Sequence, residues 1–176
     1  MTESEKRLET VLEHVRMENA HNLRGIMGTF GESARYDDSP WDDRREGLGS
    51  VQEYYEELLT ALPDLKIVIE HQLASDEQVV LEVRIQGTHL GNWRGLPPTR
   101  RKVDFPLCGI FTFDSQGKLA GERIYYDRGT VLQQIGLYRD PRSALGSLEA
   151  LLAHPITITH AYLQKPWLSS SKRKAS

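Results

Sequence analysis

The stretch that decides the fold is Gly87–Phe113, GTHLGNWRGLPPTRRKVDFPLCGIFTF. Apolar residues recur at every second position in its second half, Val103–Phe113, and in the segment just before it, Val79–Ile85. This is the pattern of strands with one buried face. Glycines, prolines and basic residues fill positions 91–102, where they exclude a helix or a regular strand and keep the chain hydrated. The sequence therefore predicts a long hairpin whose arms are joined by an irregular polar crossing.

Helices are predicted before this hairpin. Apolar residues at positions i, i+3, i+4 and i+7 indicate amphipathic helices over Ser4–Ala20, over Leu23–Phe30 and from Gly49 or Ser50 through Ala61. Ala34–Asp37 is expected to be a short strand, and the charged segment 38–47 that follows it a loop.

The period of two begins at Leu65 and continues to a last strand, Leu119–Tyr126, with polar turns at 75–77 and 114–117. Short helices are predicted after it, over Gly129–Ile135 and Pro141–Ala153. Helices followed by an antiparallel meander indicate the α+β class.

Composition limits the possible partners. The chain of 176 residues has a formal net charge of −3 and a pI near 6.1, so it has no overall attraction to nucleic acid or to an anionic membrane. The polar N-terminus carries no apolar run, and the single cysteine, Cys108, cannot form an internal disulfide. We expect a cytoplasmic protein that binds neither nucleic acid nor membrane.

Three motifs together resemble a known family. They are G-T-H-x-G at 87–91, G-x-P-P-T-x-R at 95–101 and D-x-x-x-x-L-Q-Q-x-G at 127–136, and they resemble the SnoaL-like polyketide cyclases of the nuclear-transport-factor-2-like (NTF2-like) superfamily. The resemblance covers Glu3–Gly136. It implies a cone in which the N-terminal helices pack on a curved antiparallel sheet and leave a pocket, and it implies a homodimer. Isomerases, cyclases, hydrolases, hydroxylases and non-enzymes all use this scaffold, so the fold alone does not define the reaction.

The resemblance also divides the chain. Residues 1–136 would form the NTF2-like domain, and residues 137–168 a C-terminal helical extension outside the resemblance. The serine- and lysine-rich end, 169–176, is expected to be disordered.

The last strand carries the main catalytic candidate. Alternation places Glu122, Ile124 and Tyr126 on one face of the strand and Arg123 on the other. If the first face lines the pocket, burial would raise the pKa of Glu122 toward the range of a general base, and Tyr126 could donate a hydrogen bond to an oxyanion. The alternative is that Glu122 is a solvated cross-strand partner.

The resemblance argues against the reaction of the aklanonate-type cyclases, which use an aspartate on this strand and a histidine on the preceding one. Those two positions fall on Ile124 and on or near Gly109. Neither residue can act in acid–base catalysis, so ring closure by that mechanism is not expected here.

Two further residues are candidates for chemistry. Tyr36 could pair with Glu122 to polarise and deprotonate a carbonyl compound, as in the ketosteroid isomerases of the superfamily, although tyrosines are often core residues. His89, in the G-T-H-x-G motif, could act as an acid, a base or a binding group. Alternatively, its ring packs against Trp93 and Pro97 and holds the crossing in place. The aspartates of 37–43 suggest the Asp-Arg-Asp set of limonene-epoxide hydrolases, but the sequence cannot place them in one cavity.

The remaining predicted contacts are apolar or aromatic. The residues expected to line a ligand site are Tyr54, Tyr55, Trp93, Leu107, Phe111 and Ile124. Histidine and cysteine spacing predicts no metal site, and no nucleotide- or phosphate-binding motif is present, so no cofactor is expected.

Two functions from different classes remain open. One is a cofactor-free isomerase, cyclase or hydratase acting on a small apolar carbonyl compound. The other is a non-catalytic ligand-binding or accessory homodimer. A cavity of about 300 Å³ or more with Glu122 facing into it would favour the enzyme, whereas a filled core with Glu122 in solvent would favour the binding protein.

Overall fold

The computed structural model describes residues 1–163. These residues belong to two compact units, Met1–Leu137 and a second unit that begins at Tyr138. The predicted disordered end, 169–176, and the last part of the predicted extension lie outside the described residues.

Three helices precede or interrupt the first strands of unit 1: α1 (Glu3–Asn19), α2 (Leu23–Thr29) and α3 (Leu48–Ala61). Thr2 and Glu5 form a capping box at the start of α1, which satisfies two of the free N–H groups there. Asn22 caps α2 through its side-chain oxygen. The three predicted helices are therefore present, with ends that differ by at most two residues from the sequence-based bounds.

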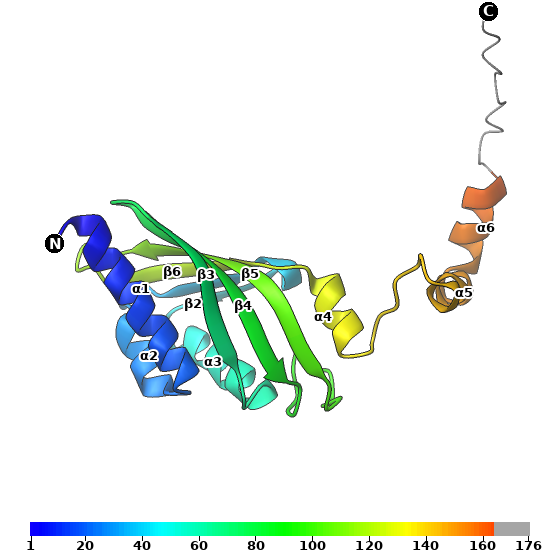
Figure 1. Ribbon diagram of the computed structural model, residues 1–176, viewed down its shortest axis with the longest axis horizontal. Coiled ribbons are helices and arrows are strands. Elements are labelled where there is room, and N and C mark those ends of the chain that lie inside the picture. Colours follow the sequence, from blue (N-terminus) through cyan, green and yellow to red (C-terminus); the bar gives the residue numbers. More distant parts are fainter. Residues whose placement is uncertain (164–176) are drawn as a thin grey trace, which may run out of the picture. The chain divides into compact units, whose positions relative to one another are not determined.

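The sheet has six strands in the order β2-β1-β6-β5-β4-β3 (Figure 1). Their bounds are β1 Arg35–Asp38, β2 Asp43–Glu46, β3 Lys66–Ala74, β4 Gln78–Thr88, β5 Lys102–Phe113 and β6 Leu119–Tyr125. The antiparallel ladder between β4 and β5 runs from Gln78↔Thr112 to Thr88↔Lys102. The long hairpin and the meander β3-β4-β5-β6 predicted from the sequence are thus confirmed.

Two features of the sheet differ from the prediction. β1 pairs with β6 in parallel, with Tyr36 opposite Glu122, so the sheet is mixed rather than antiparallel. The segment 38–47, predicted as a loop, contains a short 3-10 helix, Ser39–Trp41, and the strand β2. β2 has the sequence DRRE. It therefore has no apolar alternation. It pairs with β1 at the edge of the sheet, and Asp43 forms ion pairs with Arg45 and Arg94.

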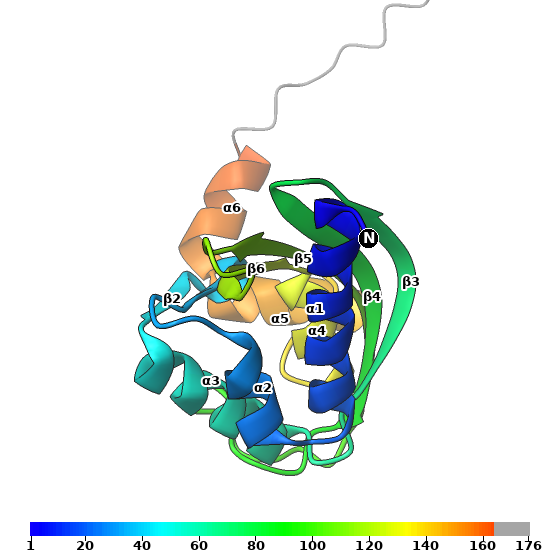
Figure 2. The same cartoon turned by 90° about the vertical axis from the view of Figure 1, so that its left-hand side faces the viewer.

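The sheet is curved, and α1, α2 and α3 lie on one of its faces (Figure 2). The end of α1 is joined to β3 by two hydrogen bonds between the Asn19 side chain and the backbone of Ile67, at 2.7 and 2.9 Å. Buried apolar residues from the helices and from β4, β5 and β6 form one core cluster between the two layers. The predicted packing of N-terminal helices on a curved sheet is confirmed.

The crossing between β4 and β5 docks on the end of α3. The N–H groups of Leu90 and Gly91 donate to the carbonyl oxygen of Ala61 at 2.9 and 3.2 Å, which satisfies an acceptor at the helix terminus. Gly91 lies so close to α3 that a Cβ atom there would be 2.2 Å from the carbonyl oxygen of Thr60. The approach buries Trp93 of the crossing.

Unit 1 ends with α4 (Arg128–Gln134), which Asp127 caps. Unit 2 contains α5 (Ala144–Ala153) and α6 (Pro155–Leu163), of which only the first was predicted.

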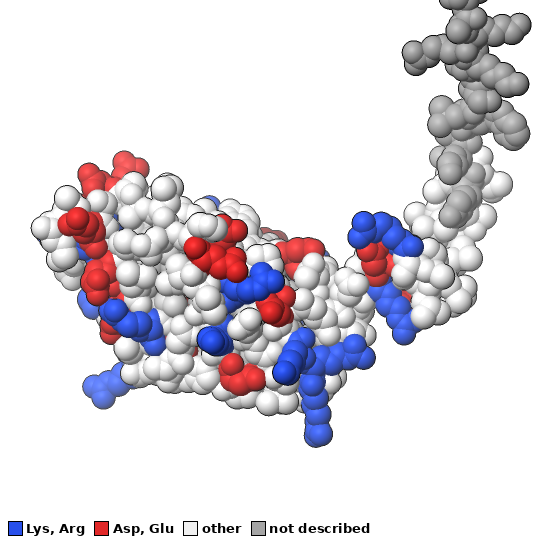
Figure 3. Space-filling model, viewed as in Figure 1, with Lys and Arg blue, Asp and Glu red and all other residues white. Residues whose placement is uncertain are grey.

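No helix within residues 1–163 is long and apolar enough to cross a membrane. Acidic and basic side chains are intermixed on the face of unit 1 shown in Figure 3.

Candidate functional site

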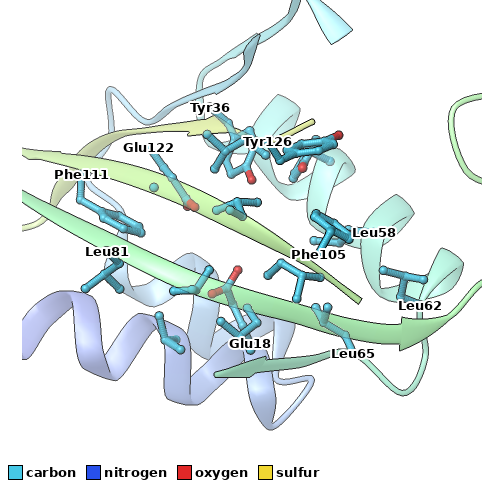
Figure 4. A pocket seen from close by; sticks show the side chains of 18 of the residues that line it. Glu18, Tyr36, Leu58, Leu62, Leu65, Leu81, Phe105, Phe111, Glu122 and Tyr126 are labelled. Atoms are coloured by element: carbon cyan, nitrogen blue, oxygen red, sulfur yellow. The ribbon is translucent and has the colours of Figure 1, made fainter. Parts of the chain in front are cut away.

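A cavity lies between the helices and the sheet of unit 1 (Figure 4). Apolar and aromatic side chains form most of its wall. Five of the six predicted ligand contacts are among them: Tyr54, Trp93, Leu107, Phe111 and Ile124. The sixth, Tyr55, is completely buried and is not among the residues that line the cavity.

The cavity is smaller than the size that would favour the enzyme. Its volume is about 60 Å³, well under about 300 Å³. A single water needs about 10–15 Å³ by this measure, so the cavity holds roughly four water-sized groups. Large aromatic side chains from α3, the crossing and the sheet fill the rest of the space.

Glu122 faces this cavity from β6 and is only 6% exposed. Ile124 lies on the same face of the strand, whereas Arg123 points to the opposite side and pairs with Asp37 at 2.8 Å. The alternation of β6 therefore runs as the sequence indicates. The alternative in which Glu122 is a solvated cross-strand partner is wrong.

The carboxylate of Glu122 is held by a buried hydrogen-bond chain. The hydroxyl of Tyr55 donates to Glu122 Oε2 at 2.7 Å, and the same hydroxyl lies 2.9 Å from His14 Nε2. His14 Nε2 is also 3.4 Å from Glu122 Oε2. Tyr55 thus orients the carboxylate that the sequence had singled out, although it does not touch the cavity.

His14 is completely buried on α1. The hydroxyl of Thr29 donates to the carbonyl oxygen of Ile26 at 2.6 Å, so the Thr29 oxygen accepts from His14 Nδ1 at 2.8 Å. Burial opposes the charged imidazolium, but Glu18 and Glu122 outweigh it and raise the pKa of His14.

Glu18 lies one helical turn after His14 and also lines the cavity. It is 6% exposed, and its Oε1 atom is 3.8 Å from His14 Nε2. The pKa of Glu18 is raised to about 8, mainly by burial; the charge of Glu122 adds to the rise, and His14 opposes it. At neutral pH this carboxyl is therefore largely protonated.

The sequence analysis missed His14 and Glu18, although a signal was present. Both lie at helical spacing from Val11, at i+3 and i+7, on the apolar stripe that the same pattern predicts to be buried. A titratable residue on a buried stripe requires a partner or a function. A search for titratable residues on the predicted buried stripe of this helix would have identified both His14 and Glu18.

Tyr36 lines the cavity and lies opposite Glu122 in the ladder between β1 and β6. Its ring stacks on that of Tyr54, with a centroid separation of 3.9 Å, and burial raises the pKa of both phenols well above the ordinary range. Within residues 1–163, the hydroxyl that donates to Glu122 is that of Tyr55. Tyr36 and Glu122 therefore line the same cavity without a hydrogen bond between their side chains.

Tyr126 also lines the cavity. Its oxygen accepts from the indole N–H of Trp41 at 2.7 Å, and its hydroxyl donates to Asp38 Oδ2 at 3.5 Å. Burial raises its pKa. The hydroxyl is thus already engaged with protein groups, which leaves it poorly placed to stabilise an oxyanion.

An ion-pair cluster lies behind Tyr126. Arg94 pairs with Asp38 at 2.5 Å and also with Asp43, and its guanidinium lies 5.2 Å from the ring of Tyr54. The structure therefore brings together an Asp-Arg-Asp set that the sequence could not place. None of its three members lines the cavity, and the cluster joins the crossing to β1 and β2.

His89 is completely buried in the crossing and does not line the cavity. Its Nδ1 atom lies 3.1 Å from the hydroxyl of Thr99. Its ring packs edge-on against that of Trp93, with 6.1 Å between the ring centroids. Burial lowers its pKa. This geometry favours the packing role over the catalytic one. Within residues 1–163, no group of three or more His, Cys, Asp or Glu side chains could hold a metal ion.

The fold and this cavity define an NTF2-like protein. The family model of the SnoaL-like polyketide cyclases matches residues 6–135, and the chain belongs to that family. The resemblance drawn from the three motifs is thereby confirmed.

Solved structures with the same fold include three informative ones. AclR of Streptomyces galilaeus, proposed to be a hydroxylase, is 24% identical with a TM-score of 0.68 and covers 89% of this chain and 98% of its own. A protein from Jannaschia sp. CCS1, proposed to be a SnoaL-like polyketide cyclase, is 23% identical with a TM-score of 0.71. The match covers 79% of this chain and 97% of that protein. SalBIII is described as an epoxide hydrolase/cyclase-like enzyme in pyran ring formation in the polyether salinomycin. It is 27% identical with a TM-score of 0.62, and the match covers 72% of this chain and 95% of SalBIII. No curated protein matches the sequence.

Proposed function

We propose that the protein is a cofactor-independent acid–base enzyme that removes a proton from the carbon next to the carbonyl group of a small, apolar compound. Glu122 is the general base. The observation that carries this proposal is a carboxylate, 6% exposed, that faces an apolar cavity and is oriented by the Tyr55 hydroxyl at 2.7 Å.

The contacts of Glu122 leave one oxygen available. Oε2 accepts from Tyr55 and faces His14, whereas Oε1 makes no hydrogen bond to any residue from 1 to 163. A base must reach the proton that it removes, and its position must be fixed before the substrate arrives. The hydrogen bonds that link Thr29, His14 and Tyr55 fix Oε2 of Glu122 and leave its Oε1 for the substrate.

The cavity restricts the substrate. An apolar wall selects an apolar molecule, and a volume of about 60 Å³ admits only a small one unless wall side chains change rotamer. The family's cyclisation mechanism is not part of this proposal. The positions that its aspartate and histidine would occupy carry Ile124 and Gly109, and both residues line the cavity. Enolisation, isomerisation or hydration through Glu122 fits the residues that are present.

A second candidate function is ligand binding without turnover, in a homodimeric accessory protein. The small cavity and the apolar residue at position 124 favour it. The burial and orientation of Glu122 favour the enzyme, because an ionisable group is costly to bury where only binding of an apolar molecule is needed.

Proton exchange provides the test. Cyclopentanone, a small ring ketone, is incubated in D₂O with the protein, and deuterium entry next to the carbonyl is followed by NMR. We expect the wild-type protein to accelerate exchange and Glu122→Gln to lower the protein-dependent rate by about 100-fold or more. Glu82→Gln, an exposed residue of β4, should keep the wild-type rate. Saturable binding of the ketone with no exchange would support the binding protein and contradict the enzyme.

A further inference from the structure

We propose that Glu18 is the general acid of this site and gives its proton to the carbonyl oxygen while Glu122 takes the proton from carbon. This inference rests on the proposed function and adds a second catalytic residue to it. It also accounts for the presence of two carboxyl groups in a cavity that is otherwise almost entirely apolar.

The first argument is position. Glu18 approaches the cavity from α1 and Glu122 approaches it from β6, with their side chains directed toward the same space (Figure 4). A small molecule between them would have one carboxyl group on each side. This is the arrangement needed to remove a proton at one atom and supply one at another.

The second argument is availability. The carboxyl group of Glu18 makes no hydrogen bond to any described residue, and its one ionic partner there is His14 at 3.8 Å. Tyr126, another polar group of the wall, is already bonded to Trp41 and Asp38. The Glu18 carboxyl is therefore a polar group of the wall that is free to meet a substrate oxygen, while Oε1 of Glu122 is free to meet the proton on carbon.

The third argument is charge. The groups that face Glu18 are His14 on α1, Glu122 on β6 and Tyr55 on α3. One imidazolium can balance one buried carboxylate, and a second unbalanced negative charge would be costly in this environment. Glu122 has the closer imidazole, at 3.4 Å against 3.8 Å, and also the Tyr55 donor. Glu122 therefore keeps the charge and Glu18 keeps the proton, which agrees with the pKa of Glu18 of about 8.

The step is balanced without a further reactant. The bond between the substrate carbon and its hydrogen breaks, and Glu122 accepts the proton. The electron pair forms a carbon–carbon double bond, the carbonyl π pair moves to oxygen, and that oxygen takes the proton of Glu18. The products are an enol, a protonated Glu122 and an ionised Glu18. The reverse step restores both groups.

The pH dependence of cyclopentanone exchange tests this role. After subtraction of the buffer rate, the wild-type rate should fall as pH rises through about 8, because Glu18 loses the proton that it must donate. Glu18→Gln should lower the rate at pH 7 by about 100-fold, and its residual rate should show no fall near pH 8. Glu18→Asp keeps a carboxyl group and should retain a fall at alkaline pH.

The controls separate this inference from the proposed function. Glu13→Gln alters a glutamate of the same helix that pairs with Arg16 and does not line the cavity, and it should leave rate and profile unchanged. If Glu122→Gln abolishes exchange but Glu18→Gln keeps the wild-type rate and profile, Glu18 is not the acid and the proposed function stands. A wild-type rate that does not fall between pH 7 and 10 contradicts the role of Glu18 without any variant. If the wild-type protein does not accelerate exchange, both proposals are wrong.

Discussion

Glu18 links the stability of the protein to pH. Its pKa in the folded protein is about 8, above the ordinary value of 4.5. Between these values the folded protein binds more protons than the unfolded chain, so the free energy of unfolding falls as pH rises through this range. The stability that protonated Glu18 provides is fully present below about pH 4.5 and lost above about pH 8.

Glu18→Gln should therefore change the pH dependence of stability. We expect the wild-type protein to lose more free energy of unfolding than this variant between pH 5 and pH 9, with a difference of about 4 kcal/mol. Urea unfolding at the two pH values measures it. Equal losses in the two proteins would show that Glu18 has an ordinary pKa, and Glu13→Gln should behave as the wild type.

The residues of the site were predictable to different degrees. The inward orientation of Glu122 follows from the alternation of a single strand, which is local information. The hydrogen bond from Tyr55 to Glu122 joins residues 67 positions apart. Which of several tyrosines reaches the carboxylate depends on how α3 packs on the sheet, and the sequence pattern does not contain this.

At the scale of elements, the ion pairs of Arg94 connect the crossing to β1 and β2. Asp38 is 1% exposed in its side chain, and Arg94 is the cation that pairs with it. Burial raises the pKa of Asp38, while Arg94 lowers it. Removal of the guanidinium would leave a buried carboxylate without its counter-ion, which is strongly destabilising.

Arg94→Met should consequently lower the free energy of unfolding at pH 7 by about 3 kcal/mol, measured by urea unfolding. Arg100→Met is a matched control: Arg100 lies in the same crossing, is exposed, and has a similar positive φ of 60° against 52° for Arg94. This control should change stability little. Equal effects of the two substitutions would mean that the buried ion pairs do not hold the crossing.

The same ion pairs explain why β2 could not be predicted. Strand patterns are recognised because apolar side chains alternate, and Asp43–Glu46 has only charged side chains. Its place at the edge of the sheet depends on pairing with β1 and on Arg94, which is 51 residues from Asp43. The parallel pairing of β1 with β6 depends in the same way on contacts distant in sequence.

At the scale of the whole unit, the cavity exists because the helical layer and the curved sheet do not pack completely. The order of helices and strands, and with it the fold, was predictable from periodicity and three motifs. The cavity volume was not, because it depends on the rotamers of side chains from many elements. The same packing brings the end of α1 opposite β6 and so places two carboxyl groups in one apolar space.

The most direct test of this account is a titration of glutamate side-chain carboxyl carbons by ¹³C NMR. The signal that is missing from Glu18→Gln should titrate near pH 8 in the wild-type protein. In Glu122→Gln the same signal should titrate at lower pH, because the neighbouring negative charge that raises the pKa of Glu18 is gone. Titration of every glutamate at about pH 4 to 5, or a Glu18 signal unaffected by Glu122→Gln, would contradict the claim that the two carboxyl groups share one cavity.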